Sequence, residues 1–334
     1  MREVVGHDAV WGLLTRAAET RTVRHAYLLA GVRGIGKTSL ALEFARYLEC
    51  ENPDRVAHAP CNTCASCRKI LHGNHPDMTL VEVEKGKRQL GVDAVRENVM
   101  RAATLAPTSG MWRIFVLPEV EHMTTNTVNA LLKTVEEPPE GVVLLLTTTN
   151  ADDLLPTLVS RCQILPMYPL PVETVETLLR DRKGLSPEEA GVLARESDGR
   201  PGWALRAIEQ PDVLEDRKEQ MKLIQRAPAA SRDERLRIAA TLAKDTETAA
   251  RALDHWALFW RQVVLAANGA ERLMPDDTAA GRLGRAIGAE RALRFMDAIL
   301  RARMSLDQNA NPRLTLEVLM LDLPSPARTV PPRS

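Results

Sequence analysis

One stretch decides the fold of this 334-residue chain: Gly31-Val32-Arg33-Gly34-Ile35-Gly36-Lys37-Thr38. The apolar run 26–30 precedes it as a buried strand would, and the apolar residues of 39–45 recur at helical spacing. A turn from a strand into a helix leaves several backbone N–H groups unpaired in front of the helix dipole, so that it attracts phosphate. Lys37 can reach the β- and γ-phosphates of a nucleotide, and Thr38 offers a hydroxyl to Mg²⁺. The stretch predicts a phosphate-binding loop (P-loop) within an α/β fold.

The composition is that of a globular protein without a membrane segment. Hydrophobic residues make up 45% of the chain and charged residues 26%, which is ordinary for a soluble fold. The 44 basic and 44 acidic residues balance, which argues against a free-standing nucleic-acid binder but not against contact with DNA within a larger assembly. No apolar run approaches the ~18–20 residues of a membrane span, and the N-terminus lacks the apolar segment of a signal peptide. These features predict a cytoplasmic protein.

Strand-like and helical patterns alternate through the first half of the chain. The apolar runs that predict strands are 26–30, 78–83, 113–117, 142–147 and 163–166. Each run is followed by turn residues and then by a helical pattern, which is the signature of a parallel sheet flanked by helices. The sequence therefore predicts that residues 1–168 form one α/β domain.

The second half of the chain carries only helical patterns. Residues 172–210 have the spacing of three short helices, one of them starting at Ser186-Pro187-Glu188-Glu189 with a serine N-cap and a glutamate three residues later. Residues 211–323 are helical, and Asn311-Pro312 opens the last helix. The tail 324–334 holds four prolines and is predicted to be disordered. We expect a small helical domain and then a larger all-α domain after the sheet.

Four of the five cysteines gather between the P-loop helix and the second strand. They are Cys50, Cys61, Cys64 and Cys67, within 18 residues. The two-residue spacers are those of tight metal-binding turns, and four thiolates can close a tetrahedron around Zn²⁺. Unrelated thiols or two disulfides are the alternatives, and disulfides do not suit a cytosolic chain. Because four cysteine ligands leave no open coordination position, the predicted role of the zinc is structural, whereas Cys162 lies apart and is expected to be a buried small residue.

Five further stretches are informative through their order along the chain. They are Val-Val-Gly-His at 4–7, His-Ala-Tyr-Leu-Leu at 25–29, Asn-Ala-Leu-Leu-Lys-Thr-Val-Glu-Glu-Pro-Pro at 129–139, Leu-Pro-Thr-Leu-Val-Ser-Arg-Cys at 155–162 and Asn-Ala-Asn-Pro-Arg-Leu-Thr-Leu-Glu at 309–317. In this order, and with the cysteines where a zinc module is inserted, the chain resembles bacterial DNA polymerase III clamp-loader subunits of the AAA+ class. The first gap between the cysteines is slightly long for that family. The resemblance spans about residues 4–322.

The resemblance implies a division of labour among the domains. Residues 1–168 would be the AAA+ nucleotide-binding core, 169–210 its helical lid, and 211–323 a collar that assembles with other subunits. Arg161, in the Ser-Arg-Cys motif, would act in trans on ATP bound by a neighbour, because a planar, permanently charged guanidinium stabilises phosphoryl charge. An ordinary surface arginine, or one paired to a carboxylate at a strand end, is the alternative. The implied partners are the gamma/tau motor and delta subunits and, through the complex, the sliding clamp and primer–template DNA.

The P-loop and the resemblance together imply ATP or ADP with Mg²⁺ as a ligand. Thr149 would be the polar sensor at the end of the fourth strand. The residues predicted to contact the nucleotide are Gly31, Arg33, Gly34, Gly36, Lys37, Thr38, Ser39 and Thr149.

Two positions depart from what an ATPase of this family needs. The strand 113–117 should be followed by an aspartate that orients the Mg²⁺ shell and a glutamate that polarises water, but Pro118 stands at the aspartate position and only Glu119 is kept. The family's motor subunits carry a lid arginine at the position of Gly202, and Arg200 lies two residues too early, before a proline. Compensation by neighbouring acids and by Arg200 is the alternative.

A kept Ser-Arg-Cys motif beside these two losses favours the delta-prime branch of the family over the motor branch. A delta-prime subunit is a stator, which presents its arginine to a motor neighbour and need not hydrolyse ATP, so that ATPase activity of the chain itself is expected to be absent or weak. The alternative is a competent gamma/tau-like motor ATPase of the same complex. A free-standing nucleotide kinase is a third possibility, which the cysteine module and the collar-like helices disfavour.

Overall fold

The computed structural model describes residues 3–54, 57–82, 90–270 and 278–325. The chain divides into two compact units, Met1–Glu209 and Gln210–Ser334. The first unit holds the sheet and the P-loop, and the second is built from helices. Each unit has buried apolar clusters of its own.

A five-stranded parallel sheet forms the centre of the first unit. Its strand order is β2-β3-β4-β1-β5, and every neighbouring pair is parallel. The strands are β1 (Ala26–Ala30), β2 (Met78–Leu80), β3 (Arg113–Leu117), β4 (Val142–Thr148) and β5 (Gln163–Pro166). The predicted α/β class with a parallel sheet is therefore confirmed.

The second strand is shorter than the predicted run 78–83. It ends at Leu80, although the Val81 N–H still donates to the Val116 carbonyl at 2.9 Å. Val81 is buried among the core residues, whereas residues 83–89 lie outside the described ranges. An apolar run in the sequence indicates which residues are buried. The length of an edge strand depends instead on how far it pairs with its single neighbouring strand. The prediction was wrong at this boundary for that reason.

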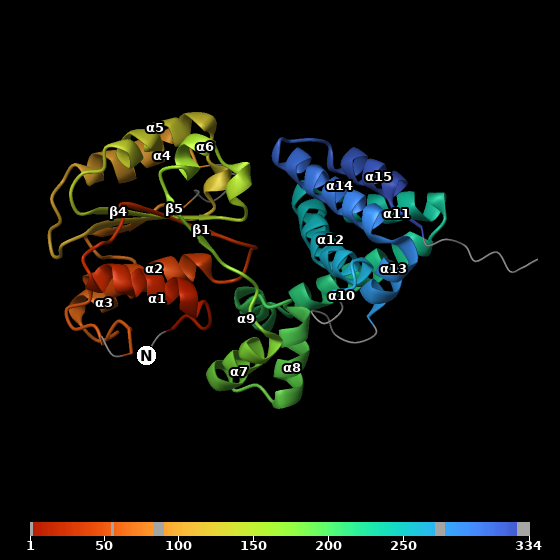
Figure 1. Ribbon diagram of the computed structural model, residues 1–334, viewed down its shortest axis with the longest axis horizontal. Coiled ribbons are helices and arrows are strands. Elements are labelled where there is room, and N and C mark those ends of the chain that lie inside the picture. Colours follow the sequence, from red (N-terminus) through yellow and green to blue (C-terminus); the bar gives the residue numbers. More distant parts are fainter. Residues whose placement is uncertain (1–2, 55–56, 83–89, 271–277, 326–334) are drawn as a thin grey trace, which may run out of the picture. The chain divides into compact units, whose positions relative to one another are not determined.

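Helices cover both faces of the sheet (Figure 1). The first face carries α1 (Asp8–Glu19), α2 (Lys37–Glu49) and α3 (Ala65–Leu71). The second face carries α4 (Val92–Val95), the π-helical segment η1 (Arg96–Arg101), α5 (Thr125–Glu136) and α6 (Pro156–Val159), and 3₁₀ turns η2 (Val120–His122) and η3 (Ala151–Asp153) follow β3 and β4. Side chains alternate along a strand, so that Tyr27 and Leu29 pack on the first face and Leu28 on the second. Burial of both faces explains why these strands read as continuous apolar runs.

The carboxyl ends of three neighbouring strands bring predicted site residues together. β1 leads into the P-loop, β3 into Pro118, and β4 into Thr149. The strands are in register at this edge, where Ala30 pairs with Thr148. Ligands of open parallel sheets bind outside the carboxyl ends of the strands, so the fold places the P-loop where a ligand is expected.

Three helices complete the first unit: α7 (Val172–Lys183), α8 (Pro187–Glu196) and α9 (Pro201–Glu209). α8 begins with the predicted capping box. The Glu189 N–H donates to Ser186 Oγ at 3.3 Å, and the Ser186 N–H donates back to the Glu189 carboxylate at 3.1 Å. This local signal was sufficient to predict where α8 starts.

The described part of the second unit is helical throughout. Its helices are α10 (Pro211–Arg226), the 3₁₀ turn η4 (Ala227–Ala229), α11 (Arg232–Leu242), α12 (Thr246–Ala267), α13 (Ala279–Ile287), α14 (Ala289–Asp307) and α15 (Pro312–Asp322). Trp256 and Trp260 of α12 pack against Phe295 of α14, with ring centroids 5.9 and 4.5 Å apart. Asn311 caps α15, as predicted, by accepting the Leu314 N–H at 3.1 Å.

No helix in the described ranges is long and apolar enough to cross a membrane. Of the tail 324–334, for which the sequence predicts disorder, only Pro324 and Ser325 are described. The rest of the tail lies outside the described residues.

Candidate functional sites

The P-loop turns from β1 into α2 as predicted. Gly36 precedes the first residue of the helix with φ +102°, a conformation that residues with a side chain rarely adopt. The Lys37 ammonium lies over the loop and donates to the carbonyls of Gly31 at 2.5 Å and Val32 at 3.1 Å. Lys37 and Thr38 thus stand in the first turn of α2, with the loop wrapped around the lysine.

Burial sets the charge state of Lys37. The residue is only 7% exposed, and desolvation lowers its pKa to about 8, against the opposing attraction of Glu121 and Glu119. The ammonium is therefore mostly charged at neutral pH and loses its charge in mildly alkaline solution. A phosphate beside Lys37 would favour the charged form.

Glu119, at the position of the water-polarising acid, is held by the P-loop. Arg33 donates to both of its oxygens, from Nε at 3.0 Å and from Nη2 at 2.8 Å. Burial raises the pKa of Glu119, but the bond from Arg33 outweighs it and holds the pKa below its usual value. Glu119 also has φ +50°, and its N–H donates to Thr147 Oγ1 at 3.1 Å. The backbone bond and the two bonds from Arg33 place this carboxylate against the loop, although the side chains of the pair are 50% and 38% exposed, so that the pair itself contributes little.

Glu121 lies at the same edge and contacts the predicted sensor. Its Oε1 accepts the Thr149 N–H at 3.1 Å, which places the carboxylate between the ends of β3 and β4. Sequence reasoning did not assign it a role. The available signal was its place two residues beyond Glu119, with a strand end before it, and a single 3₁₀ turn brings it back towards the sheet. Pro118 contributes no carboxylate to this edge.

The start of α9 packs directly on the P-loop within the first unit. The Gly202 N–H, at the start of α9, donates to the Gly34 carbonyl at 2.8 Å. A Cβ added at Gly202 would lie 2.9 Å from that carbonyl oxygen, closer than real Cβ atoms approach. Glycine at this position is therefore required by the contact itself.

Arg200 does not take the place of the missing lid arginine. It is 6% exposed, donates from Nε to the Ser197 carbonyl at 2.8 Å, and lies 5.8 Å from the centre of the Trp203 ring. Its guanidinium thus belongs to the packing around the start of α9. The alternative in which Arg200 compensates for Gly202 is not supported by this geometry.

A cavity of about 330 Å³ lies beside the P-loop. Its P-loop side is formed by Gly36 and Ser39, and its apolar walls include Val5, Leu178 and Leu205. It therefore lies between the N-terminal segment, the start of α2 and the lid. An apolar wall next to a phosphate-binding turn fits the base of a nucleotide whose phosphates meet the N–H groups of the turn.

Arg161 lies near the amino ends of the strands, whereas the P-loop of the same chain follows the carboxyl end of β1. It follows α6 and comes just before β5, whose first residue, Gln163, pairs with Tyr27. β1 runs from Tyr27 towards Gly31, so at least four strand residues, about 13 Å at roughly 3.3 Å each, separate the two sites along the sheet. An arginine side chain does not span that length.

The Arg161 guanidinium is held loosely at the surface. Its Nη2 lies 2.9 Å from Glu136 Oε1, and its Nη1 donates to the Thr157 carbonyl at 2.9 Å. The two side chains of the ion pair are 38% and 45% exposed. Exposed pairs contribute only about 0–1 kcal/mol, so Arg161 can exchange Glu136 for another anion at small cost.

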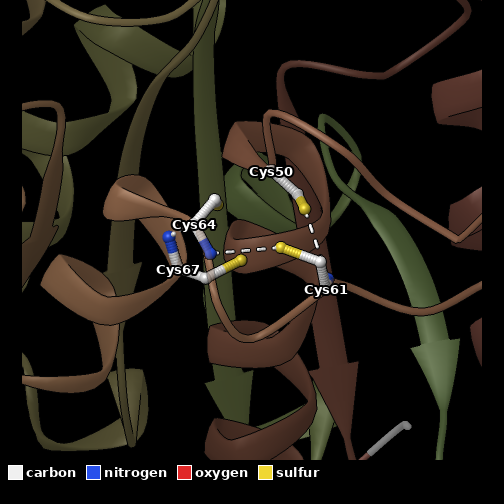
Figure 2. Close-up of side chains that lie close together, drawn as sticks. All are labelled: Cys50, Cys61, Cys64 and Cys67. Atoms are coloured by element: carbon white, nitrogen blue, oxygen red, sulfur yellow. Dashed lines mark hydrogen bonds between the residues drawn. The ribbon is translucent and has the colours of Figure 1, made fainter.

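The four predicted cysteines form a compact cluster (Figure 2). One sulfur from each of Cys50, Cys61, Cys64 and Cys67 lies within 4.8 Å of the others, and all four are free thiols. Backbone N–H groups donate to three of the sulfurs at 3.3–3.4 Å, and a hydrogen bond from Thr63 lowers the pKa of Cys61 to about 6. Burial instead raises the pKa of Cys50 and Cys67, so that metal binding would have to displace the protons of these two thiols. The donor set fits tetrahedral Zn²⁺.

The cluster is joined to the P-loop by a single helix. Cys50 directly follows the last residue of α2, while Lys37 is its first, and Cys64 caps α3 by accepting the Cys67 N–H. A metal held by the cluster would therefore fix the far end of the P-loop helix.

A second group of potential ligands lies next to the cluster. Glu49, His75 and Asp77 are buried and offer atoms within 4.8 Å of one another. However, the Asp77 oxygens accept two backbone N–H groups and pair with Arg113 at 3.1 Å, and His75 Nδ1 accepts the Asp77 N–H. His75 Nε2 must then carry the proton, and it and Glu49 Oε1 are buried without a hydrogen-bond partner among the described residues. The Asp77 carboxylate is thus already held by protein groups, and we assign no metal to this group.

The sequence family described as "DNA polymerase III, delta subunit" matches residues 6–171 of this chain. The chain belongs to the DNA polymerase III clamp-loader family. The matched residues carry the AAA+-like sheet, the P-loop, the cysteine cluster and Arg161. The family resemblance inferred from the sequence is thereby confirmed.

Two proteins of Escherichia coli (strain K12) are similar to this clamp-loader family member. DNA polymerase III subunit tau is 34% identical over 213 residues, which are 62% of this chain and 32% of tau. DNA polymerase III subunit delta' is 36% identical over 194 residues, which are 58% of this chain and 57% of delta'. The chain thus spans about a third of the length of tau and less than two thirds of delta', and the two similarities do not separate the subunit types.

A solved structure, of a DNA polymerase III gamma-subunit-related protein from Thermotoga maritima, is similar over 93% of this chain and 97% of its own length. The sequence identity is 18% and the TM-score is 0.46.

Proposed function

We propose that this chain is a delta-prime-like stator of the DNA polymerase III clamp loader and supplies Arg161 in trans to a neighbouring ATPase subunit. The observation that carries the proposal is the position of Arg161 at the edge of the sheet away from its own P-loop. A guanidinium that is half-exposed, weakly paired and out of reach of its own nucleotide site suits a phosphate brought by another chain.

The residues around the P-loop support the same proposal. Hydrolysis needs an anchored Mg²⁺ and a free acid to polarise water. Pro118 supplies no metal ligand, Glu119 is bound by Arg33, and Gly202 offers no side chain to the nucleotide. We infer that hydrolysis by this chain is absent or weak, while Lys37 and the loop N–H groups retain the capacity to hold ATP or ADP.

The proposed partners follow from membership of the clamp-loader family. They are the gamma/tau motor and delta subunits, with the sliding clamp and primer–template DNA engaged through the complete assembly. The chain would contribute to ATP-driven loading of the clamp onto primed DNA. Its second, helical unit, residues 211–323, is proposed to act as the collar that assembles with the other subunits, and residues 169–210 as the lid.

The cysteine cluster is proposed to hold one structural Zn²⁺ through Cys50, Cys61, Cys64 and Cys67. Four thiolate ligands leave no position for substrate, so the ion would stabilise the fold rather than take part in a reaction. The N–H bonds to the sulfurs support this assignment.

A gamma/tau-like motor is the second candidate function. It is favoured by the complete P-loop and by Glu121, which lies against the predicted sensor Thr149. In a motor, Lys37 and Thr38 would bind ATP with Mg²⁺, and Glu119 would leave Arg33 to orient the attacking water.

Steady-state hydrolysis by the purified full chain separates the two candidates. The stator predicts background turnover that Lys37→Ala leaves unchanged. Turnover that is lost in Lys37→Ala and in Glu119→Gln would establish the motor and overturn the stator. Nucleotide binding measured on the same samples shows whether the loop is occupied in either case.

A further inference from the structure

The cavity beside the P-loop is lined in part by the helix that carries two of the clustered cysteines. Besides the N-terminal segment, α2, α7 and α9, its lining includes Ile70 and Leu71 of α3. Cys64 caps α3, and Cys67 lies in the first turn of this helix. Ile70 therefore follows Cys67 by one helical turn, so that a metal held by the cluster would position this wall of the cavity.

Arg46 of α2 connects the cluster to the cavity a second time. It lines the cavity and is only 3% exposed. Its Nη1 donates to Asn62 Oδ1 at 3.1 Å, and Asn62 lies in the turn between Cys61 and Cys64. Its Nη2 lies 2.8 Å from Glu3 Oε2. One buried guanidinium thus joins the turn between two cysteines to the N-terminal segment.

The N-terminal segment forms another wall of the same cavity. The N–H groups of Glu3 and Val4 donate to the carboxylate of Glu43 at 2.5 and 2.7 Å, and Glu43 is fully buried on α2. Val4 and Val5 then line the cavity together with Gly36 of the P-loop. The position of this wall therefore depends on α2 through Glu43, and on the cysteine cluster through the bond between Glu3 and Arg46.

We propose that nucleotide binding in this cavity is positively coupled to metal binding by the cysteine cluster, and that Arg46 is the positioning residue that connects the two sites. Four sulfurs tied to one ion fix the turn 61–64 and the start of α3. In the metal-free chain, hydrogen bonds and packing alone hold these parts, and a nucleotide has to order them as it binds. The ligand that binds first removes this entropic cost for the second.

The inference rests on the proposed zinc and nucleotide sites, and it holds equally for a stator and for a motor. Coupling between two sites is reciprocal. Zinc is therefore expected to lower the Kd for ADP about tenfold, and saturating ADP to lower the Kd for zinc by the same factor.

The test uses the full chain under reducing conditions, so that the free thiols do not form disulfides. Calorimetric titration with ADP and Mg²⁺, on zinc-loaded and zinc-stripped protein, measures the first factor. Competition with a chelator, with and without ADP, measures the second. A melting transition of the stripped protein above the assay temperature shows that it is still folded.

Two variants test the connection through Arg46. Arg46→Met removes the guanidinium but keeps an unbranched side chain, and Asn62→Gly removes its acceptor while tolerating the φ of +60° at that position. Both should keep about one zinc per chain and reduce the effect of zinc on ADP binding to about threefold or less. Arg68→Met is the matched control, because Arg68 is an exposed arginine of α3 outside the cavity lining.

The outcomes separate the coupling from the two sites themselves. If the chain binds zinc and ADP with Kd values that do not depend on each other, the inference is overturned and both sites stand. An undiminished effect of zinc in Arg46→Met and Asn62→Gly, or an equal loss in Arg68→Met, overturns the role of Arg46. A chain without zinc, or a zinc-loaded chain without ADP binding, overturns the inference together with the corresponding site. Equal factors for the two ligands, reduced only in Arg46→Met and Asn62→Gly, support it.

Discussion

Basic side chains lie at both ends of the strands of the parallel sheet, and their surroundings differ. At the carboxyl edge, Lys37 is buried under its own loop carbonyls and Arg33 holds Glu119 with two hydrogen bonds. At the amino edge, Arg161 pairs with Glu136 and donates to the Thr157 carbonyl, and this ion pair is about as exposed as the one between Arg33 and Glu119. The difference lies in their distance from the P-loop: Arg33 belongs to the loop, whereas Arg161 lies out of its reach. On the proposed function, Arg161 is therefore the arginine available to a partner's phosphate.

The largest expected effect is that of removing Arg161, at the amino ends of the strands. Arg161→Ala should lower turnover at the neighbouring site that it serves by about 10³-fold, the lower end of the range for trans-acting arginines. Single-turnover hydrolysis by the reconstituted clamp loader is the measurement. Arg161→Lys is the matched control and should recover little, because a lysine is a point charge without the planar fork of arginine. Turnover within twofold of the wild-type value would contradict the trans-acting role of Arg161.

Loss of the metal tests whether the cysteine cluster stabilises the unit that carries the P-loop. Cys64→Ser should reduce bound zinc from about one ion per chain to none and lower the free energy of unfolding by about 3 kcal/mol. This loss is below the roughly 10–16 kcal/mol of zinc-finger peptides, because the unit has its own core. Metal analysis and thermal melts measure both. Cys162→Ser, outside the cluster, should keep its zinc, and a zinc-free wild-type protein would contradict the assignment.

A side chain at Gly202 tests the contact that closes the lid on the P-loop. Gly202→Ala should destabilise the first unit by about 1–3 kcal/mol, as overpacking does, because its Cβ would meet the Gly34 carbonyl at 2.9 Å. Gly12→Ala is the control, since nothing lies within 4 Å of a Cβ at that helical position, and it should be neutral or slightly stabilising. Denaturant titration distinguishes them. Equal stability of the two variants would contradict the close contact between Gly202 and the Gly34 carbonyl.

The smallest effect concerns the charge of Lys37. Since burial lowers its pKa to about 8, the ammonium is lost as pH rises above 8, and the Kd for ATP should rise by up to about tenfold per pH unit. The contribution of Lys37 to stability does not fall in this range, because between pH 8 and 10.5 its side chain binds the proton in the unfolded chain and this contribution increases with pH. Equilibrium binding from pH 7 to 9.5 is the measurement. Lys37→Arg should give a flat profile, and a flat profile in the wild type would contradict the shifted pKa.

Features encoded in short stretches were predictable from the sequence. The strands, the P-loop, the cysteine cluster and the caps at Ser186 and Asn311 depend on neighbours within a few residues, and the structure has them. The β2 boundary was wrong by at least two residues because an edge strand ends where its pairing ends. Such a boundary depends on another strand more than thirty residues away.

The contacts that decide how the P-loop behaves were not predictable. The Arg33–Glu119 pair joins residues 86 positions apart, and the Gly202–Gly34 bond joins α9 to the loop although the two lie far apart in the sequence. Sequence reasoning noted Pro118, Glu119 and Gly202 as departures but had no means of telling which groups are engaged with one another. Only the packed fold brings these residues together.

The lid contact also has an evolutionary consequence. With Gly202 against the Gly34 carbonyl, an arginine introduced there has first to push α9 away from the loop. If the chain is a stator, as proposed, a first step towards a motor at this position would cost stability before it gave any activity. Replacement of Pro118 by an acid would still leave Gly202 without a side chain for the nucleotide. Close packing of α9 on the P-loop would thus make the proposed stator hard to convert by single mutations.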